Sequence, residues 1–163
     1  VPDEVIFAAD AIATGLCGGS QFWVPGGDKV LPNNTCPLDQ SIGGSKIGSD
    51  LPVFPDRGYL CGRDTCDGKK KMYELLADFK EVYVMELPNR QSEYGLELWK
   101  KEINRFKEYL EERFRIVITD NMIRDAIRLS NQNRKAVQGL YEVMKLGSTA
   151  DVRKAIVPDS VWQ

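Results

Sequence analysis

The pattern of hydrophobic and polar positions changes near residue 90. Before it, short apolar runs alternate with helix-like segments, and after it long charged segments carry apolar residues at helical spacing. The first part also holds seven of the eight prolines and all four cysteines. This pattern predicts an α/β domain over 1–90, a helical hairpin over 91–147 and a C-terminal segment over 148–163 that leads toward a second domain.

Strands and helices alternate in the first part. Strands are expected at 13–19, 58–62 and 81–87, and helices at 2–12, 36–48 and 66–79. Such alternation indicates an α/β, Rossmann-like parallel sheet with flanking helices. Ligands collect at the carboxyl ends of the strands in these sheets. Three cysteines fall at or just beyond such ends, and a fourth opens a helix, so several thiols are expected near one crevice: Cys17, Cys61, Cys66 and Cys36.

The second part predicts two long helices. One apolar face recurs at intervals of three and four residues, at Leu96, Trp99, Ile103, Phe106 and Leu110. Thr119 is a good N-cap for the next helix. The apolar stripe of that helix and its expected terminator are Ile123, Ile127, Val137, Leu140, Met144 and Gly147. Both stripes are interpreted as core packing.

Length and charge restrict the class of protein. The 163 residues suffice for one substantial core. A net charge of −2 argues against nucleic acid and anionic membranes as partners, and no apolar run reaches membrane-spanning length. The acidic start, 1-VPDEVIFAADAIATG-15, does not fit a secretory signal, so a cytoplasmic protein is expected. Because the chain lacks an initiator Met and a closing element, it is expected to be part of a longer protein.

The chain has no histidine, which excludes Ser-His-Asp and Cys-His nucleophile pairs and any zinc site with histidine. The four cysteines are separated by 18, 24 and 4 residues, and none forms a C-x-x-C pair. Two disulfides in a secreted protein would be compatible with this number. A reduced setting is the better interpretation, because the chain is large enough to fold without bridges. A zinc site made only of cysteines is the weakest of these interpretations, because the cysteine spacing does not match the usual zinc motifs.

The stretch 60-LCGRDTCDGKKKMYELL-76 is the most informative one. It is not a phosphate loop, because the glycine spacing is wrong and a lysine replaces the magnesium-binding hydroxyl. An ordinary helix start, capped by Thr65 or Asp67, explains part of it. A metal-ligating Cys66 at a helix N-terminus explains it equally well. The first turn holds three lysines, whose positive charge is unfavourable at the positive end of the helix dipole: Lys69, Lys70 and Lys71. A bound anion would offset this charge.

Four motifs in this order resemble the 2-hydroxyacyl-CoA dehydratase family. They are 2-PDEVIFAADAI-12, 15-GLCGG-19, 35-TCPL-38 and 65-TCDGKKKMYELL-76. That family includes dehydratase subunits, benzoyl-CoA reductase subunits and double-cubane-cluster reductases. The resemblance extends from residue 1 to about residue 147, and its most specific part is T-C-D-G-K-K-K. Family members are longer and carry a second α/β domain.

The resemblance implies an iron–sulfur enzyme. It implies that Cys36 and Cys66 bind iron in a 4Fe-4S or double-cubane cluster, with Cys17 as a further ligand in the double-cubane branch. The implied substrate is an acyl-CoA thioester, activated as a ketyl radical by an electron from an ATP-dependent activator protein. A homodimer or heterodimer is expected for the full-length enzyme. The lysines Lys69–Lys71 would hold the anionic acyl-CoA or the activator surface.

Two features depart from the family pattern. Residues 39–58 differ from the usual continuation after T-C-P-L, and Cys61 has no counterpart, so it is interpreted as a buried thiol ending a strand. Two alternatives therefore stay open: a non-catalytic scaffold or electron-transfer subunit, and a structural α/β domain with buried thiols. The sequence does not distinguish dehydration from reduction, and it does not identify the acyl group.

Overall fold

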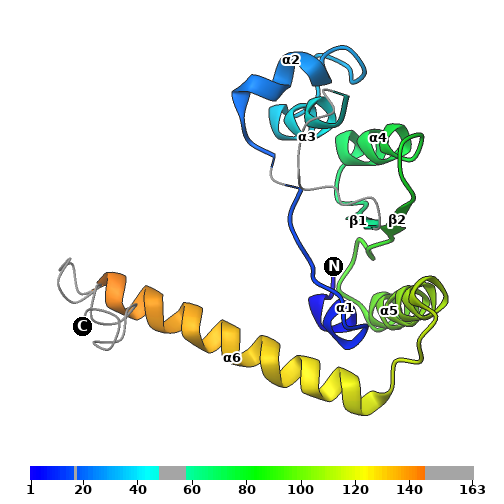
Figure 1. Cartoon of the computed structure of the whole chain (residues 1–163), viewed down its shortest axis with the longest axis vertical. Coiled ribbons are helices and arrows are strands. Elements are labelled where there is room, and N and C mark those ends of the chain that lie inside the picture. The colour runs from blue at the N-terminus through cyan, green and yellow to red at the C-terminus, as the bar shows by residue number, and fades with distance from the viewer. Residues whose placement is uncertain (17, 48–57, 146–163) are drawn as a thin grey trace. The chain divides into compact units, whose positions relative to one another are not determined.

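A computed structural model describes residues 1–16, 18–47 and 58–145 (Figure 1). The chain divides into two compact units. The first consists of Val1 and Ala13–Leu110, and the second of Pro2–Ile12 and the residues from Glu111 onward. The predicted domain boundaries at residues 90 and 147 stay a prediction, and the segment 148–163 lies outside the described residues.

A small parallel sheet organises the first unit. Strands β1 (Leu60–Arg63) and β2 (Val82–Met85) pair with Leu60 opposite Val82 and Arg63 opposite Met85. The chain passes between them through helix α4 (Asp67–Leu76). Past the carboxyl ends of the strands, the Leu87 N–H donates to Asp64 Oδ1 at 2.8 Å. The β1–α4–β2 unit is therefore closed at the end of the sheet from which α4 departs.

The first unit also contains a short 3₁₀ helix and three further helices: η1 (Gln21–Trp23), α2 (Val24–Gly27), α3 (Pro37–Ile47) and most of α5 (Glu93–Phe114). Its buried apolar cluster joins the β1–α4–β2 unit to the loop before α3, through Leu31, Leu60, Met72 and Leu76. The next residue in each strand points to the opposite face, as the two-residue period of a strand requires. There Tyr83 contacts Phe106 of α5, with ring centroids 5.2 Å apart.

Helices α2 and α3 approach each other through glycine. A Cβ at Gly27 would overlap the Gln40 backbone, and a Cβ at Gly44 would overlap the Trp23 carbonyl oxygen. Only glycine permits two backbones to come this close. The glycine pairs at 26–27 and 43–44 thus fix α3 against the segment before it.

The second unit pairs α1 (Asp3–Ala8) with α6 (Asp120–Lys145). Glu4 of α1 accepts hydrogen bonds from the Ser130 hydroxyl, at 3.0 Å, and from the Arg134 guanidinium. The predicted cap of α6 is confirmed, because the Met122 N–H donates to Thr119 Oγ1 at 3.3 Å.

Several predicted elements are confirmed and others are corrected. The helices expected at 36–48 and 66–79 and the strand expected at 81–87 are present with shorter bounds, and the strand expected at 58–62 is present at Leu60–Arg63. The strand expected over 13–19 is wrong for its described residues, and the helix expected over 2–12 ends at Ala8. The sheet in the described ranges has two strands, so the α/β class holds and a larger Rossmann-like sheet is not confirmed.

The apolar stripes are also corrected. Phe106 and Leu110 of α5 are buried, but Leu96 is largely exposed. On α6 the predicted core residues Val137, Leu140 and Met144 are exposed, so core packing is wrong for this part of the stripe. Among the described residues, no helix combines the length and apolar character that crossing a bilayer requires.

Replacing Tyr83 tests how β2 is held against α5. Its hydroxyl donates to Glu102 Oε1 at 3.1 Å, and Glu102 also accepts the Glu86 N–H at 3.4 Å. We expect Tyr83→Phe to lower the free energy of unfolding by about 1 kcal/mol in urea titrations. The exposed Tyr94→Phe is the control and should change nothing. Equal stability of Tyr83→Phe and the parent would contradict this account.

The same substitution has a pH signature. Burial, followed by the Glu102 hydrogen bond, raises the pKa of Tyr83 above its usual value. Its contribution to stability is therefore fully present below about pH 10, where the unfolded phenol ionises, and is lost as the pH rises further. Tyr83→Phe should flatten that alkaline loss.

Candidate metal centre at two helix starts

Cys66 forms the start of α4. Its backbone is extended (φ −153°, ψ 159°), and its sulfur accepts the Lys69 N–H at 3.4 Å. The side chain is exposed. The N-cap is thus the cysteine itself and not Thr65 or Asp67, the residues expected for an ordinary helix start. One sulfur atom both satisfies a free helix N–H and remains open to solvent.

Cys36 occupies the corresponding place before α3. Its carbonyl oxygen accepts the Gln40 N–H at 3.0 Å, so it is the residue that precedes the first helical position, Pro37. Proline suits that position because its missing N–H has no helical partner there. The Cys36 thiol is exposed. The two candidate ligands therefore share one local arrangement.

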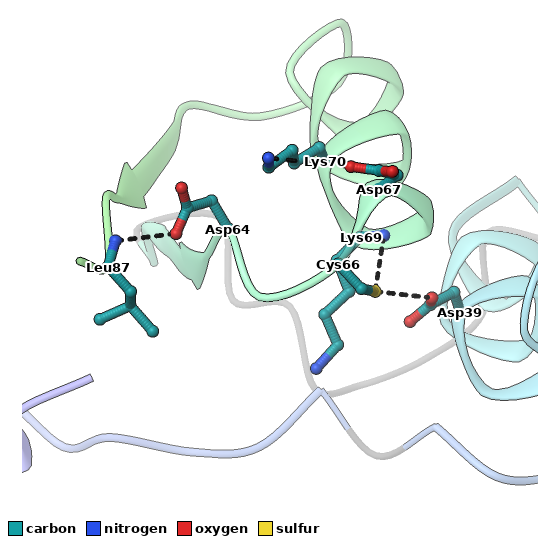
Figure 2. A network of polar contacts seen from close by, with 7 residues as sticks. All are labelled: Asp39, Asp64, Cys66, Asp67, Lys69, Lys70 and Leu87. Atoms are coloured by element: carbon teal, nitrogen blue, oxygen red, sulfur yellow. Dashed lines mark hydrogen bonds and ion pairs between the residues drawn. The ribbon is translucent and has the colours of Figure 1, made fainter. Parts of the chain in front are cut away.

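The starts of α3 and α4 lie against each other. A Cβ at Gly68, two residues after Cys66, would lie 3.1 Å from Thr35 Cγ2 and 3.0 Å from Asp39 Oδ2. Figure 2 shows Cys66 at the start of α4 with its sulfur directed at Asp39 of α3. The fold thus brings the T-C-P and T-C-D-G motifs to one place.

Asp39 is the residue at this place that sequence reasoning missed. Its side chain is only 1% exposed, although it lies in the first turn of α3. Oδ2 accepts a weak hydrogen bond from Cys66 Sγ at 3.9 Å, and Oδ1 has no hydrogen-bond partner. In the sequence, Asp39 is an acidic residue in the first turn of a predicted helix. Such residues ordinarily stabilise the helix dipole from an exposed position, so nothing marked Asp39 as part of a site.

The segment after position 17 packs on α3. The Gly19 N–H donates to Ser41 Oγ at 3.1 Å, and Ser41 Oγ donates to the Ser20 carbonyl at 3.0 Å. Cys17 itself lies outside the described residues. The sequence neighbours of the third predicted ligand are therefore held by the helix that Cys36 begins.

Cys61 is different from Cys36 and Cys66. It lies within β1 and is half-buried, and burial raises the pKa of its thiol to about 11. A thiol with that pKa is a poor metal ligand near neutral pH because the thiolate is the binding form. This supports its interpretation as a structural thiol, but the thiol lies within β1 and does not end the strand as expected.

The described residues fit part of a metal site. Two exposed thiols at adjacent helix starts are suitable soft ligands, and the unpartnered Asp39 Oδ1 is a buried oxygen that a metal ion could bind. Within the described ranges, no group of three or more Cys, Asp or Glu side chains is arranged to hold a single metal ion. The ligand set formed by the described residues is therefore incomplete, and a metal centre here would need further ligands.

The three lysines of α4 differ from one another. Lys70 pairs with Asp67 at 3.8 Å, and Lys71 pairs with Glu74 at 2.7 Å. Lys69 is half-buried and forms no ion pair with a described residue. Exposed pairs of this kind are weak, so all three ammonium groups remain available to an anion.

The other end of α4 borders an apolar cavity of about 150 Å³. Its lining includes Leu31, Met72, Leu75 and Phe79. Cys66 lies at the opposite end of α4, so this cavity is separate from the candidate metal centre.

The geometry therefore defines a class of protein: an α/β unit that carries exposed thiols at two neighbouring helix starts. The chain belongs to the 2-hydroxyglutaryl-CoA dehydratase D-component family, which matches residues 1–155. It is 38% identical over 161 residues to the "Putative dehydratase subunit YjiM" of Escherichia coli (strain K12), covering 96% of this chain and 42% of that protein. It is 31% identical over 148 residues to a benzoyl-CoA reductase subunit of Thauera aromatica, covering 86% and 37%.

The resemblance inferred from the four motifs is thus confirmed at the level of the family. The chain spans about two-fifths of the length of these curated relatives. Both relatives are named as subunits, which indicates that members of this family occur in multi-subunit enzymes.

Thiol reactivity separates these cysteines experimentally. In the reduced, metal-free chain at about pH 8, we expect iodoacetamide to modify Cys36 and Cys66 well before Cys61. The two helix-start thiols are exposed, whereas the raised pKa leaves roughly one Cys61 in a thousand ionised. Peptide mapping by mass spectrometry gives the three rates. Modification of Cys61 at the rate of Cys66 would contradict the assignment.

Proposed function

We propose that the chain is the iron–sulfur cluster-binding part of a 2-hydroxyacyl-CoA dehydratase-like enzyme, with Cys36 and Cys66 as cluster ligands. The observation that carries the proposal is the pair of exposed thiols at the contacting starts of α3 and α4. Thiolates are the usual ligands of iron–sulfur clusters. Both thiols belong to the motifs that carry the family resemblance.

Cys17 is proposed as a third ligand. The support comes from its neighbours, because Gly19 is hydrogen-bonded to Ser41 of α3, the helix that Cys36 begins. A ligand from this segment would extend the incomplete pair of described thiols. Whether the centre is a 4Fe-4S or a double-cubane cluster depends on the complete ligand set.

A substrate and partners belong to the same proposal. A bound cluster would supply low-potential electrons, one at a time, to an acyl-CoA thioester. The lysines of α4 provide positive charge for the phosphates of acyl-CoA or for an ATP-dependent activator protein. Since both relatives are named as subunits, we also propose that the chain functions in a homodimer or heterodimer. The reductase relative makes reduction of the thioester the second candidate reaction.

Anaerobic reconstitution with iron and sulfide tests the ligands. The parent chain should bind iron stoichiometrically and develop sulfur-to-iron absorbance. Cys36→Ser and Cys66→Ser should each lose most of both signals, because a hydroxyl is a poor replacement for a thiolate. Cys61→Ser is the matched control and should retain them, since its thiol lies in β1. Full iron binding by Cys36→Ser and Cys66→Ser, or none by the parent, would contradict the proposal.

Charge removal tests the lysines. Replacing Lys69, Lys70 and Lys71 together by Ala should weaken equilibrium binding of 2-hydroxyglutaryl-CoA or benzoyl-CoA about tenfold, or about 1.4 kcal/mol. The control removes the same charge from exposed lysines elsewhere, at Lys100, Lys101 and Lys135. Titration calorimetry gives both affinities. If the two triple variants bind equally well, the α4 lysines have no special role.

A further inference from the structure

We propose that Asp39 is a non-cysteine ligand of the metal centre, through its Oδ1 atom. This inference rests on the proposed function and extends its ligand set beyond the cysteines. It starts from an energetic problem, because Asp39 is 1% exposed and its Oδ1 atom has no hydrogen-bond partner. Burying an ionised carboxylate is costly unless a charge or several donors compensate it.

Apart from the positive end of the α3 dipole, the described side chains provide little of that compensation. The one donor to the Asp39 side chain is the Cys66 thiol at 3.9 Å, on Oδ2, and thiols are weak donors. Oδ1 has no hydrogen-bond partner, and no described lysine or arginine forms an ion pair with Asp39. Lys70 and Lys71 of α4 instead pair with Asp67 and Glu74. A cation bound at Oδ1 would supply the missing partner.

The position of Asp39 specifies which cation. Its carboxylate lies between the start of α4, where Cys66 presents its sulfur, and the first turn of α3, which Cys36 begins. Gly68 leaves room for it, since a Cβ there would lie 3.0 Å from Oδ2. A metal held by the Cys66 thiolate would thus lie within reach of Asp39, and carboxylate oxygen is a common iron ligand.

The two oxygens then have separate tasks. Oδ2 contacts Cys66 Sγ and orients it, as second partners of metal ligands do. Oδ1 is the free atom that binds the metal. A metal held by Cys66 and Asp39 would take the place of the Cys66 thiol proton, because thiols bind metals in the deprotonated form.

The test uses the full chain, reconstituted anaerobically with iron and sulfide. Asp39→Asn keeps the shape and removes the charge, and we expect the chelator concentration that strips half of the iron to fall at least about tenfold. Asp67→Asn makes the same change one residue from Cys66 on an exposed side chain, and should have no effect. Asp39→Cys should restore iron binding and raise the sulfur-to-iron absorbance per iron above that of the parent chain.

The outcomes are distinguishable. If Asp39→Asn retains iron like the parent and Asp67→Asn, the inference is wrong while the cysteine site stands. If Asp39→Asn loses iron and Asp39→Cys neither restores it nor adds absorbance, Asp39 acts only through Cys66 and is not a ligand. If the parent binds no iron, the proposed function fails first. Should Asp39→Asn fail to fold, as judged by circular dichroism, Asp39→Cys alone decides between these outcomes.

Discussion

The contact between the first turns of α3 and α4 is the constraint on which the candidate site depends. It exists because residue 68 has no side chain, which allows Thr35 and Asp39 to approach the α4 backbone. A larger residue there would press on the side chains of Thr35 and Asp39 and require them to shift. Since Cys66 also caps α4 through the Lys69 N–H, helix formation and ligand placement depend on the same sulfur atom.

The surrounding elements hold this contact from both sides. On one side, β1 leads into Cys66, and the sheet is closed by the hydrogen bond between Asp64 and Leu87 (Figure 2). On the other side, α3 is fixed by close backbone contacts at Gly27 and Gly44. The glycines and the small sheet therefore act together to place two cysteines that are far apart in sequence.

Local signals predicted local structure well. The strands around residues 60 and 83 and the α6 cap at Thr119 follow from apolar pattern and capping chemistry, and all are present. The strand expected at 13–19 was wrong because Gly18 and Gly19 pack on α3 and do not pair with a strand. The α6 stripe showed which residues share a face, but periodicity does not show what covers that face.

The residues of the candidate site were also predictable only in part. Cys36 and Cys66 could be proposed as ligands from their motifs, since each precedes a predictable helix. Asp39 could not, because its burial and its free oxygen arise from contact with α4, and Cys66 lies 27 positions away in the sequence.

The most direct test of the proposed site is thiol footprinting of the chain before and after anaerobic cluster assembly. We expect iron and sulfide to protect Cys36 and Cys66 together from alkylation, and chelation of the iron to expose both again. Cys61 should keep one slow rate throughout. Equal reactivity of Cys36 and Cys66 with and without bound iron would contradict the proposed site and show that the iron is held elsewhere.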